Sequence, residues 1–317
     1  MMEWTDMPND LAPNDVSKVI DVRDRAGTGL PFSKGLMATS VLATGLRTEQ
    51  AYAIAAEIQQ RLHALGVSRI DADALADLAC QTIEHQAGSG AAERYRAWRR
   101  AKRTGRPVIV VLSGAPGVGK STLATRLCVR LGITRVVTTD TIREVLRSVI
   151  PRSVLPELHI STYETTETHP GDPPLGAFHR QARAVSAATV PVAVRLASEH
   201  TSAIIEGVHL LPGYMKQALA DHSVRPIVVE MTAVLGNGET HRAHLVRRAH
   251  SEPNRDGQRH LRHLDRIRDL QNLLTELALA AEVPVYDIAQ SHDLTQRIVD
   301  DVVSRIEAPS PVTAGVR

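Results

Sequence analysis

The sequence is poor in several residue types, and each shortage narrows what the protein can be. It holds only two cysteines, Cys80 and Cys128, so no disulfide framework is indicated and a reducing compartment, the cytoplasm, is expected. Aromatic residues make up 3% of the chain, which leaves aliphatic side chains to fill the interior. No apolar run approaches the ~20 residues that a membrane-spanning helix needs, and residues 1–14 lack the pattern of a signal peptide. We therefore expect a cytoplasmic protein without a membrane partner.

An excess of one charge sign is also missing. Thirty-seven Lys and Arg stand against 35 Asp and Glu, and a formal charge of +2 gives no global basic field for nucleic acid. The stretch RYRAWRRAKRTGRP, residues 94–107, is a local exception with seven basic residues. It is consistent with phosphate binding, but a solvated helix end and linker is the favoured interpretation. Because basic runs are weak motifs, nucleic acid is not an expected partner.

Composition and hydrophobic pattern change along the chain and indicate two domains between two tails. Residues 1–15 and 307–317 are polar or irregular and are expected to be disordered tails. Residues 16–100 predict a small, mostly helical domain, with a hairpin around a Gly-rich turn and three helical stretches after it. Residues 101–107 are the expected linker, and residues 108–306 the larger domain. In the helical stretch 48–65, spacings of three and four predict one buried face, made of Ala51, Ile54, Ala55, Ile58 and Leu62.

The larger domain alternates short apolar runs with helical patterns. The five apolar runs have the continuous character of strands buried on both faces: Val108–Leu112, Arg135–Thr138, Ala203–Glu206, Ile227–Met231 and Val283–Tyr286. Helical patterns cover residues 120–131, 141–150, 178–199, 214–221, 239–250, 259–281 and 294–306. This alternation predicts an α/β fold in which helices flank a parallel sheet.

The stretch GAPGVGKST directly follows the first of these apolar runs. Its glycines, lysine and serine match the pattern G-x-x-x-x-G-K-[ST], and the stretch follows a strand and opens a helix, as that motif requires. Glycines let backbone amides close around phosphate oxygens, and the helix adds its free N-terminal amides. Lys120 is expected to contact the β- and γ-phosphates of a nucleoside triphosphate, and Ser121 to hold Mg²⁺. The predicted nucleotide-binding residues are Gly114, Ala115, Pro116, Gly117, Val118, Gly119, Lys120, Ser121 and Thr122.

The group that receives the phosphate is expected where the neighbouring strands end. Asp140 follows the second apolar run and is expected to face an acceptor hydroxyl or the metal, although a helix-capping role would also explain it. Arg143, one turn later, is expected to clamp an anionic substrate. Glu206 ends the third run, where P-loop enzymes hold Mg²⁺; a role in the turn is the alternative. His209 is a further substrate-binding candidate, against a general core or surface role.

The segment around residues 240–260 is unusually rich in arginine. Arginines on a mobile flap could close over the triphosphate and neutralise the charge of the transferred group. A solvated helix face is the alternative. Arg247 is the catalytic candidate among the five arginines Arg242, Arg247, Arg248, Arg255 and Arg259.

Taken in order, several stretches resemble those of 2-phosphoglycerate kinases. They are PFSKGLMATSVLATGL, RYRAWRR, LSGAPGVGKSTLATRL, TTDTIREVLR, IIEGVHLLPGYM and HLRHLDRIRDLQNLLTELA, and the resemblance covers roughly residues 16–306. It implies a P-loop kinase domain behind an N-terminal ATP-cone domain, and phosphorylation of 2-phosphoglycerate to 2,3-bisphosphoglycerate by ATP with Mg²⁺. A kinase for another small acid, sugar acid or nucleotide, and a nucleotide-sensing regulator without catalysis, stay open as alternatives.

The resemblance also assigns roles by position. Asp140 and Arg143 fall on the acceptor side, and an acceptor that is already anionic adds Arg147 and Arg180 to the substrate-binding candidates. The N-terminal domain departs from the ATP-cone pattern, since Leu36 stands where a lysine is usual. Nucleotide binding by this domain, a purely structural role and a homo-oligomer formed through it all stay open.

Overall fold

The computed structural model describes residues 19–24, 27–103, 105–164, 171, 175–220, 222–251, 257–290 and 294–307. The expected tails, residues 1–15 and 307–317, lie outside these ranges except for Glu307, which ends the last helix. The chain separates into two compact units: one holds the residues up to Val41 together with Leu46–Glu93, and the other holds Leu42–Gly45 and the chain from Arg94 onward. Residues 101–103 of the expected linker belong to a helix, α4 (Ser89–Arg103).

The first unit combines a small sheet with helices. Strand β1 (Asp21–Arg23) pairs antiparallel with β2 (Gly29–Pro31), as the expected hairpin requires, and parallel with β3 (Arg69–Asp71). The helices are α1 (Lys34–Leu42), α2 (Thr48–Ala64) and α3 (Ala72–Ala87). The five residues of α2 whose spacing predicted a buried face are its buried residues: Ala51, Ile54, Ala55, Ile58 and Leu62.

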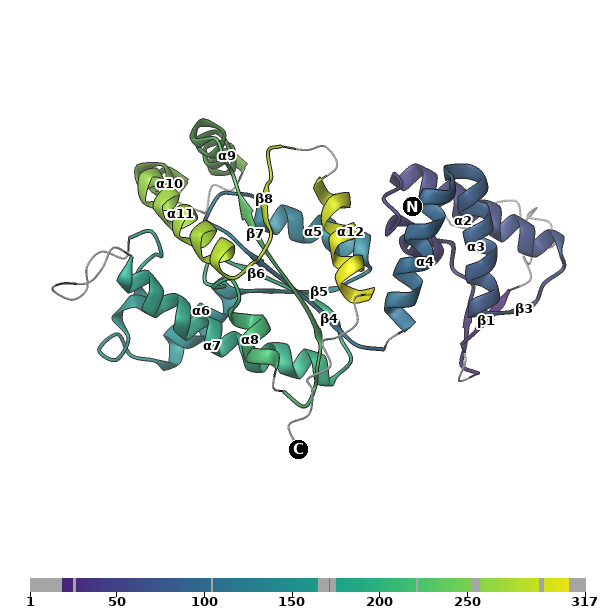
Figure 1. Ribbon diagram of the computed structural model, residues 1–317, viewed down its shortest axis with the longest axis horizontal. Helices are drawn as coiled ribbons and strands as arrows, with labels where there is room; N and C mark the ends of the chain where they lie inside the picture. Colours follow the sequence, from purple (N-terminus) through teal and green to yellow (C-terminus); the bar gives the residue numbers. More distant parts are fainter. Residues whose placement is uncertain are drawn as a thin grey trace, which may run out of the picture. The chain divides into compact units, whose positions relative to one another are not determined.

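The second unit is built on a five-stranded sheet with the order β5-β6-β4-β7-β8 (Figure 1). All four pairings are parallel, so the predicted α/β fold is confirmed. The strands are β4 (Val108–Ser113), β5 (Arg135–Thr138), β6 (Ala203–Gly207), β7 (Ile227–Val234) and β8 (Val285–Asp287). Each expected strand is present; β7 extends three residues further than expected and β8 begins two residues later.

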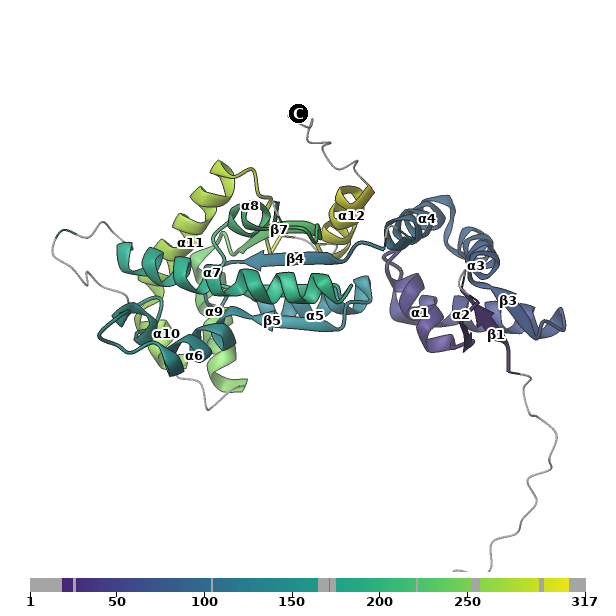
Figure 2. The same cartoon turned by 90° about the horizontal axis from the view of Figure 1, so that it is seen from below.

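Helices cover both faces of this sheet (Figures 1 and 2). Alternate residues of β4 point into two different cores, because side chains of a strand alternate between its faces. The helices of the unit after α4 are α5 (Lys120–Leu131), α6 (Thr139–Val149), α7 (Gly176–Ser198), α8 (Tyr214–Ala220), α9 (Gly238–Ser251), α10 (Gly257–Arg262), α11 (Leu264–Ala280) and α12 (Leu294–Glu307), with a 3₁₀ turn at Pro156–His159. In β4, Val110 and Leu112 pack with residues of α5, α11 and α12, whereas Ile109 and Val111 pack with residues of α7 and α8.

The single helix expected over residues 259–281 is wrong, because the chain breaks it into α10 and α11. His263 leaves helical geometry (φ −110°, ψ 21°) and stands at the N-terminus of α11. The break frees α10 to contact a different part of the unit: Arg259 pairs with Glu164, and the rings of His260 and Tyr163 lie 4.9 Å apart. Among the described residues, no helix is both long and apolar enough to span a bilayer.

The helix after the glycine loop offers a test of the core. Leu127 on α5 is fully buried, whereas Val129 on the same helix is 53% exposed. We expect Leu127→Ala to lower the free energy of unfolding by about 2–5 kcal/mol, since it opens a cavity, and Val129→Ala to change it by about 0.5 kcal/mol or less. Chemical unfolding followed by circular dichroism compares the two variants. Equal losses would contradict the packing described here.

Candidate active site

Two other segments pack closely against the glycine loop between β4 and α5. A side-chain carbon on Gly114 (φ 149°) would lie 2.4 Å from the carbonyl oxygen of Ala233 in β7. One on Gly117 (φ 81°) would lie 2.4 Å from Cδ2 of Leu245 in α9. Both positions combine a left-handed backbone with missing space, so only glycine fits them. The motif glycines therefore serve the path of the loop as well as access to its amides.

Lys120 begins α5 and is buried at the base of this loop. Its Nζ donates a hydrogen bond to the carbonyl of Ala115 at 2.8 Å. Burial lowers the pKa of Lys120; the carboxylates of Glu206 and Asp140 oppose this shift, and the charge of Arg248 adds to it. Two carboxylates and one guanidinium therefore act on the charge of the Lys120 ammonium, which is available to bind a phosphate.

Ser121, at the start of α5, forms a hydrogen bond with Glu206, near the end of β6. The Ser121 hydroxyl donates to Oε1 of Glu206 at 2.8 Å, and Glu206 lies beside Leu112 and Thr138 in the strand register. Mg²⁺ prefers oxygen ligands and needs only one or two protein groups beside substrate phosphates. The hydroxyl and carboxylate fit that requirement. No cluster of three or more His, Cys, Asp or Glu side chains suited to a metal occurs within the described ranges.

Asp140 and His209 approach each other where β5 and β6 end. The Asp140 side chain is 78% exposed, and its Oδ1 lies 3.8 Å from Nδ1 of His209. That nitrogen also forms a 2.9 Å hydrogen bond with the hydroxyl of Thr139. The N-cap of α6 is Thr138, whose Oγ1 accepts from the amide of Thr141. Capping therefore does not account for Asp140, and its carboxylate faces solvent at the mouth of the site.

His209 is fully buried and carries an unsatisfied nitrogen. Its Nε2 has no hydrogen-bond partner. Burial lowers the pKa of His209 to about 4; Asp140 opposes the shift, and Arg143 and Lys120 add to it. The ring is therefore neutral near pH 7. A buried polar atom without a partner costs free energy, which a bound molecule with a matching group would recover.

Two arginines of α6 converge on the same region. Asp140, Arg143 and Arg147 follow at spacings of three and four and so share one helix face. Arg143 donates to the carbonyl of Ile160 at 2.6 Å, and Arg147 donates to Glu144 at 2.6 Å, yet the Nε atoms of both arginines are buried without a partner. Burial first, and then the charge of Arg147, lower the pKa of Arg143. The carboxylate of Glu144, whose Oε1 lies 3.9 Å from Nη1 of Arg143 and 2.6 Å from Nη1 of Arg147, opposes this shift.

Arg180, a substrate-binding candidate, pairs with a carboxylate of this structure. Its Nε donates to the buried carboxylate of Glu157 at 2.6 Å, which ties α7 to the 3₁₀ turn. Its neighbour Gln181 is fully buried, donates to the Ile160 carbonyl at 3.0 Å and leaves its own Oε1 unpartnered. Sequence reasoning missed Gln181. The signal that could have found it is an amide side chain on the apolar face of a helix.

The arginine-rich segment divides between helix faces. Arg247 on α9 is exposed, whereas Arg248 is partly buried and contributes to the electrostatics of Lys120. Arg242 is also exposed, and Arg255 lies outside the described residues. Arg259 forms a two-pronged ion pair with Glu164. His241 and His244 of α9 contact the glycine loop, and the sequence prediction did not include them.

Comparison with known proteins decides the family. A family model described as an AAA domain matches residues 109–285. The 2-phosphoglycerate kinase of Pyrococcus furiosus is 34% identical over 292 residues, which are 90% of this chain and 94% of the relative. That of Methanopyrus kandleri is 32% identical over 282 residues, 87% of this chain and 85% of the relative. The chain belongs to the 2-phosphoglycerate kinase family. Among solved structures, shikimate kinase from Acinetobacter baumannii in complex with shikimate aligns with a TM-score of 0.38 at 19% identity, over 64% of this chain and 97% of that one.

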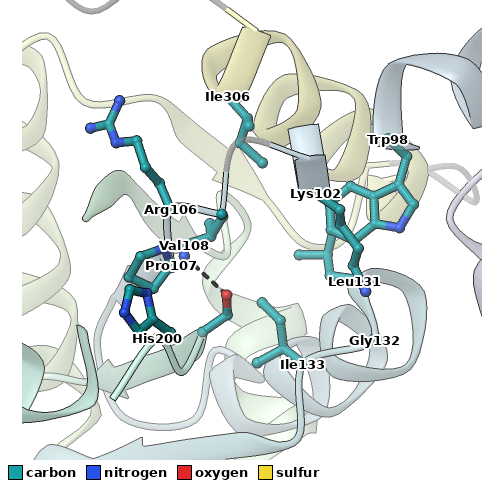
Figure 3. A pocket seen from close by; sticks show the side chains of 12 residues that line it. Trp98, Lys102, Arg106, Pro107, Val108, Leu131, Gly132, Ile133, His200 and Ile306 are labelled. Carbon is teal, nitrogen blue, oxygen red and sulfur yellow. Dashed lines mark hydrogen bonds between the residues drawn. The ribbon is translucent and has the colours of Figure 1, made fainter. Parts of the chain in front are cut away.

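A cavity of about 230 Å³ in this 2-phosphoglycerate kinase family member is separate from the candidate site (Figure 3). It lies at the amino end of β4, where the amide of Val108 donates to the Ser202 hydroxyl at 3.0 Å, whereas the glycine loop follows the carboxyl end of the same strand. Lys102 lines it and lies 5.2 Å from the ring centre of Trp98. The residues that line the cavity include none of the predicted site residues.

The buried His209 predicts a specific pH dependence of stability. The unfolded chain binds a proton at this residue near pH 6.5, and the folded chain only near pH 4. The free energy of unfolding should therefore fall as the pH decreases from about 6.5 to 4, by on the order of 3 kcal/mol, and His209 should add nothing further below that window. Urea unfolding at a series of pH values measures it. In His209→Gln, which cannot titrate, the curve should be flatter over this window; parallel curves for the two proteins would contradict the assignment.

Proposed function

We propose that the protein phosphorylates 2-phosphoglycerate with ATP and forms 2,3-bisphosphoglycerate. The observation that supports this most directly is a set of buried nitrogens without a hydrogen-bond partner, on α6 and just after β6: Nε of Arg143, Nε of Arg147 and Nε2 of His209. These groups suit a small acid with more than one negative charge. Relatives named 2-phosphoglycerate kinase, which align over about nine-tenths of the chain, favour this acid over others.

The donor half of the site holds the triphosphate. Backbone amides of Gly114–Ser121 surround the phosphates, and Lys120 adds a charge that moves with them. Ser121 and Glu206 would hold Mg²⁺ through the oxygens that now lie 2.8 Å apart. When bound there, Mg²⁺ neutralises part of the charge on the phosphate oxygens.

The acceptor half places a hydroxyl opposite the triphosphate. Asp140 accepts the proton of that hydroxyl as its oxygen attacks the γ-phosphorus; the bond from phosphorus to the β–γ bridging oxygen breaks, and ADP leaves. Arg143 and Arg147 bind the carboxylate and the phosphate of the acceptor, and Nε2 of the neutral His209 bonds to one of its oxygens. Catalysis rests on positioning and on charge neutralisation, with no covalent enzyme intermediate.

A panel of acceptors tests this function. We expect ADP release by the full chain with ATP and Mg²⁺ to depend on 2-phosphoglycerate, and to be weaker with 3-phosphoglycerate, glycerate, a sugar acid or a nucleoside monophosphate. Turnover of another acceptor alone would reject 2-phosphoglycerate as the substrate. ATP binding without any acceptor-dependent ADP release would instead indicate a nucleotide-sensing regulator.

Lys120→Ala should remove most of the ADP release while the circular dichroism spectrum stays unchanged, because the charge of the phosphates loses its partner.

The proposed role of Asp140 separates binding from transfer. Asp140→Asn keeps the size of the side chain and removes its ability to take a proton, so kcat should fall by roughly 10²–10⁴-fold while the KM for ATP changes little. Steady-state kinetics with each substrate varied in turn measures both constants. A raised KM for ATP at unchanged kcat would count against the acceptor-side assignment.

A further inference from the structure

One face of helix α9 lies directly against the glycine loop. His241, His244 and Leu245 occupy positions i, i+3 and i+4 of the helix, which share a face. His241 Nε2 donates a hydrogen bond to the carbonyl of Pro116 at 2.8 Å, and His244 hydrogen-bonds to the backbone of Gly117. Leu245 fills the space in which a side chain on residue 117 would stand. Three successive contacts therefore join the helix to the apex of the loop.

The surroundings of His241 favour its neutral form. The side chain is fully buried, and burial lowers the pKa of His241; the hydrogen bond to Pro116 opposes the shift, and the charges of Arg268 and Lys120 add to it. A neutral ring that donates from Nε2 keeps its Nδ1 as a bare acceptor, and Nδ1 has no partner. The hydrogen bond to a main-chain carbonyl is thus the only directional contact of this ring among the described residues. This hydrogen bond can therefore act through the position of helix α9.

The start of α9 is fixed independently. Oδ1 of Asn237 accepts hydrogen bonds from the amides of Glu239 and Thr240, at 2.8 and 3.2 Å. This cap defines where the helix begins, and the His241 contact, one turn later, defines how the helix is rotated against the loop. Together they determine where later side chains of the same face arrive.

The next residue on that face is Arg248, at position i+7 from His241. Arg248 is partly buried, and its charge lowers the pKa of Lys120. Arg247 is exposed, on a different face of the helix. An arginine held near the phosphate-binding lysine can neutralise charge on the transferred phosphoryl group. Misplacement by about 1 Å is enough to cost on the order of 100-fold in rate. The helix face thus links a structural contact at residue 241 to a charge at residue 248.

We propose that His241 is a positioning residue that ties α9 to the glycine loop and thereby places Arg248, rather than Arg247, at the γ-phosphate of ATP. The inference rests on the proposed phosphoryl transfer, but it holds for any acceptor, because it concerns the ATP side of the site.

Two variants of His241 separate the hydrogen bond from packing. His241→Phe keeps a ring of similar size without a donor, and His241→Gln places an amide N–H near the position of Nε2. We expect His241→Phe in the full chain to lower kcat by roughly 10- to 100-fold, with the KM for the acceptor within about twofold and the melting temperature close to that of the parent. His241→Gln should recover most of the lost kcat. Equal kcat values for His241→Phe and the parent, or a loss that His241→Gln does not reduce, would overturn the proposal.

A double-mutant cycle tests whether His241 acts through Arg248. Arg248→Ala should lower kcat more than Arg247→Ala does. Because one residue is held to place the other, His241→Phe combined with Arg248→Ala should be no slower than Arg248→Ala alone. Multiplicative losses in the double variant, or a larger loss for Arg247→Ala, would overturn the pathway through Arg248.

The outcome is separable from that of the proposed function. Every variant is compared with the parent chain on the acceptor that the parent turns over fastest. If that acceptor is not 2-phosphoglycerate, the proposed substrate fails while the comparison of His241 variants stands. If the parent uses 2-phosphoglycerate and His241→Phe matches it, the inference alone fails. A parent that turns over no acceptor overturns both.

Discussion

The lack of space around the glycine loop constrains the rest of the second unit. The backbone of β7 presses on Gly114 and a side chain of α9 presses on Gly117, so the loop is held from both sides before any phosphate arrives. In the proposed function, a loop held in this way loses little conformational freedom when it binds a triphosphate, which favours binding. The same contacts connect the phosphate site to two segments that lie more than 100 residues later in the chain.

Burial and charge differ between the donor and acceptor sides of the proposed site. On the donor side, carboxylates lie close to the buried lysine, which suits a region where cations and phosphates meet. On the proposed acceptor side, the guanidiniums of Arg143 and Arg147 share one helix face with the carboxylate of Glu144, beside a neutral histidine. Asp140 lies between the halves, close to both Lys120 and His209. Its exposed carboxylate can therefore take a proton and release it to solvent.

Much of this arrangement could be predicted from the sequence, because strong local rules apply. The continuous apolar runs gave five strands, and the motif GAPGVGKST specified both its loop and the helix after it. The rest depended on contacts between distant segments. The pairing of Arg180 with Glu157, the break at His263 and the buried amide of Gln181 have no local signature. The spacing of His241 and His244 was readable, but only the approach of α9 to the loop gives it meaning.

The central position of β4 has a consequence for how the protein is made. Its two neighbours, β6 and β7, begin 95 and 119 residues after the first residue of β4, at Ala203 and Ile227 against Val108. During translation, β4 (VIVVLS) therefore leaves the ribosome early, and both of its edges stay unpaired until most of the chain has been translated. The first compact unit, which closes on itself before residue 94, can fold during this interval. Chaperones that cover apolar nascent segments would meet this kinase at β4.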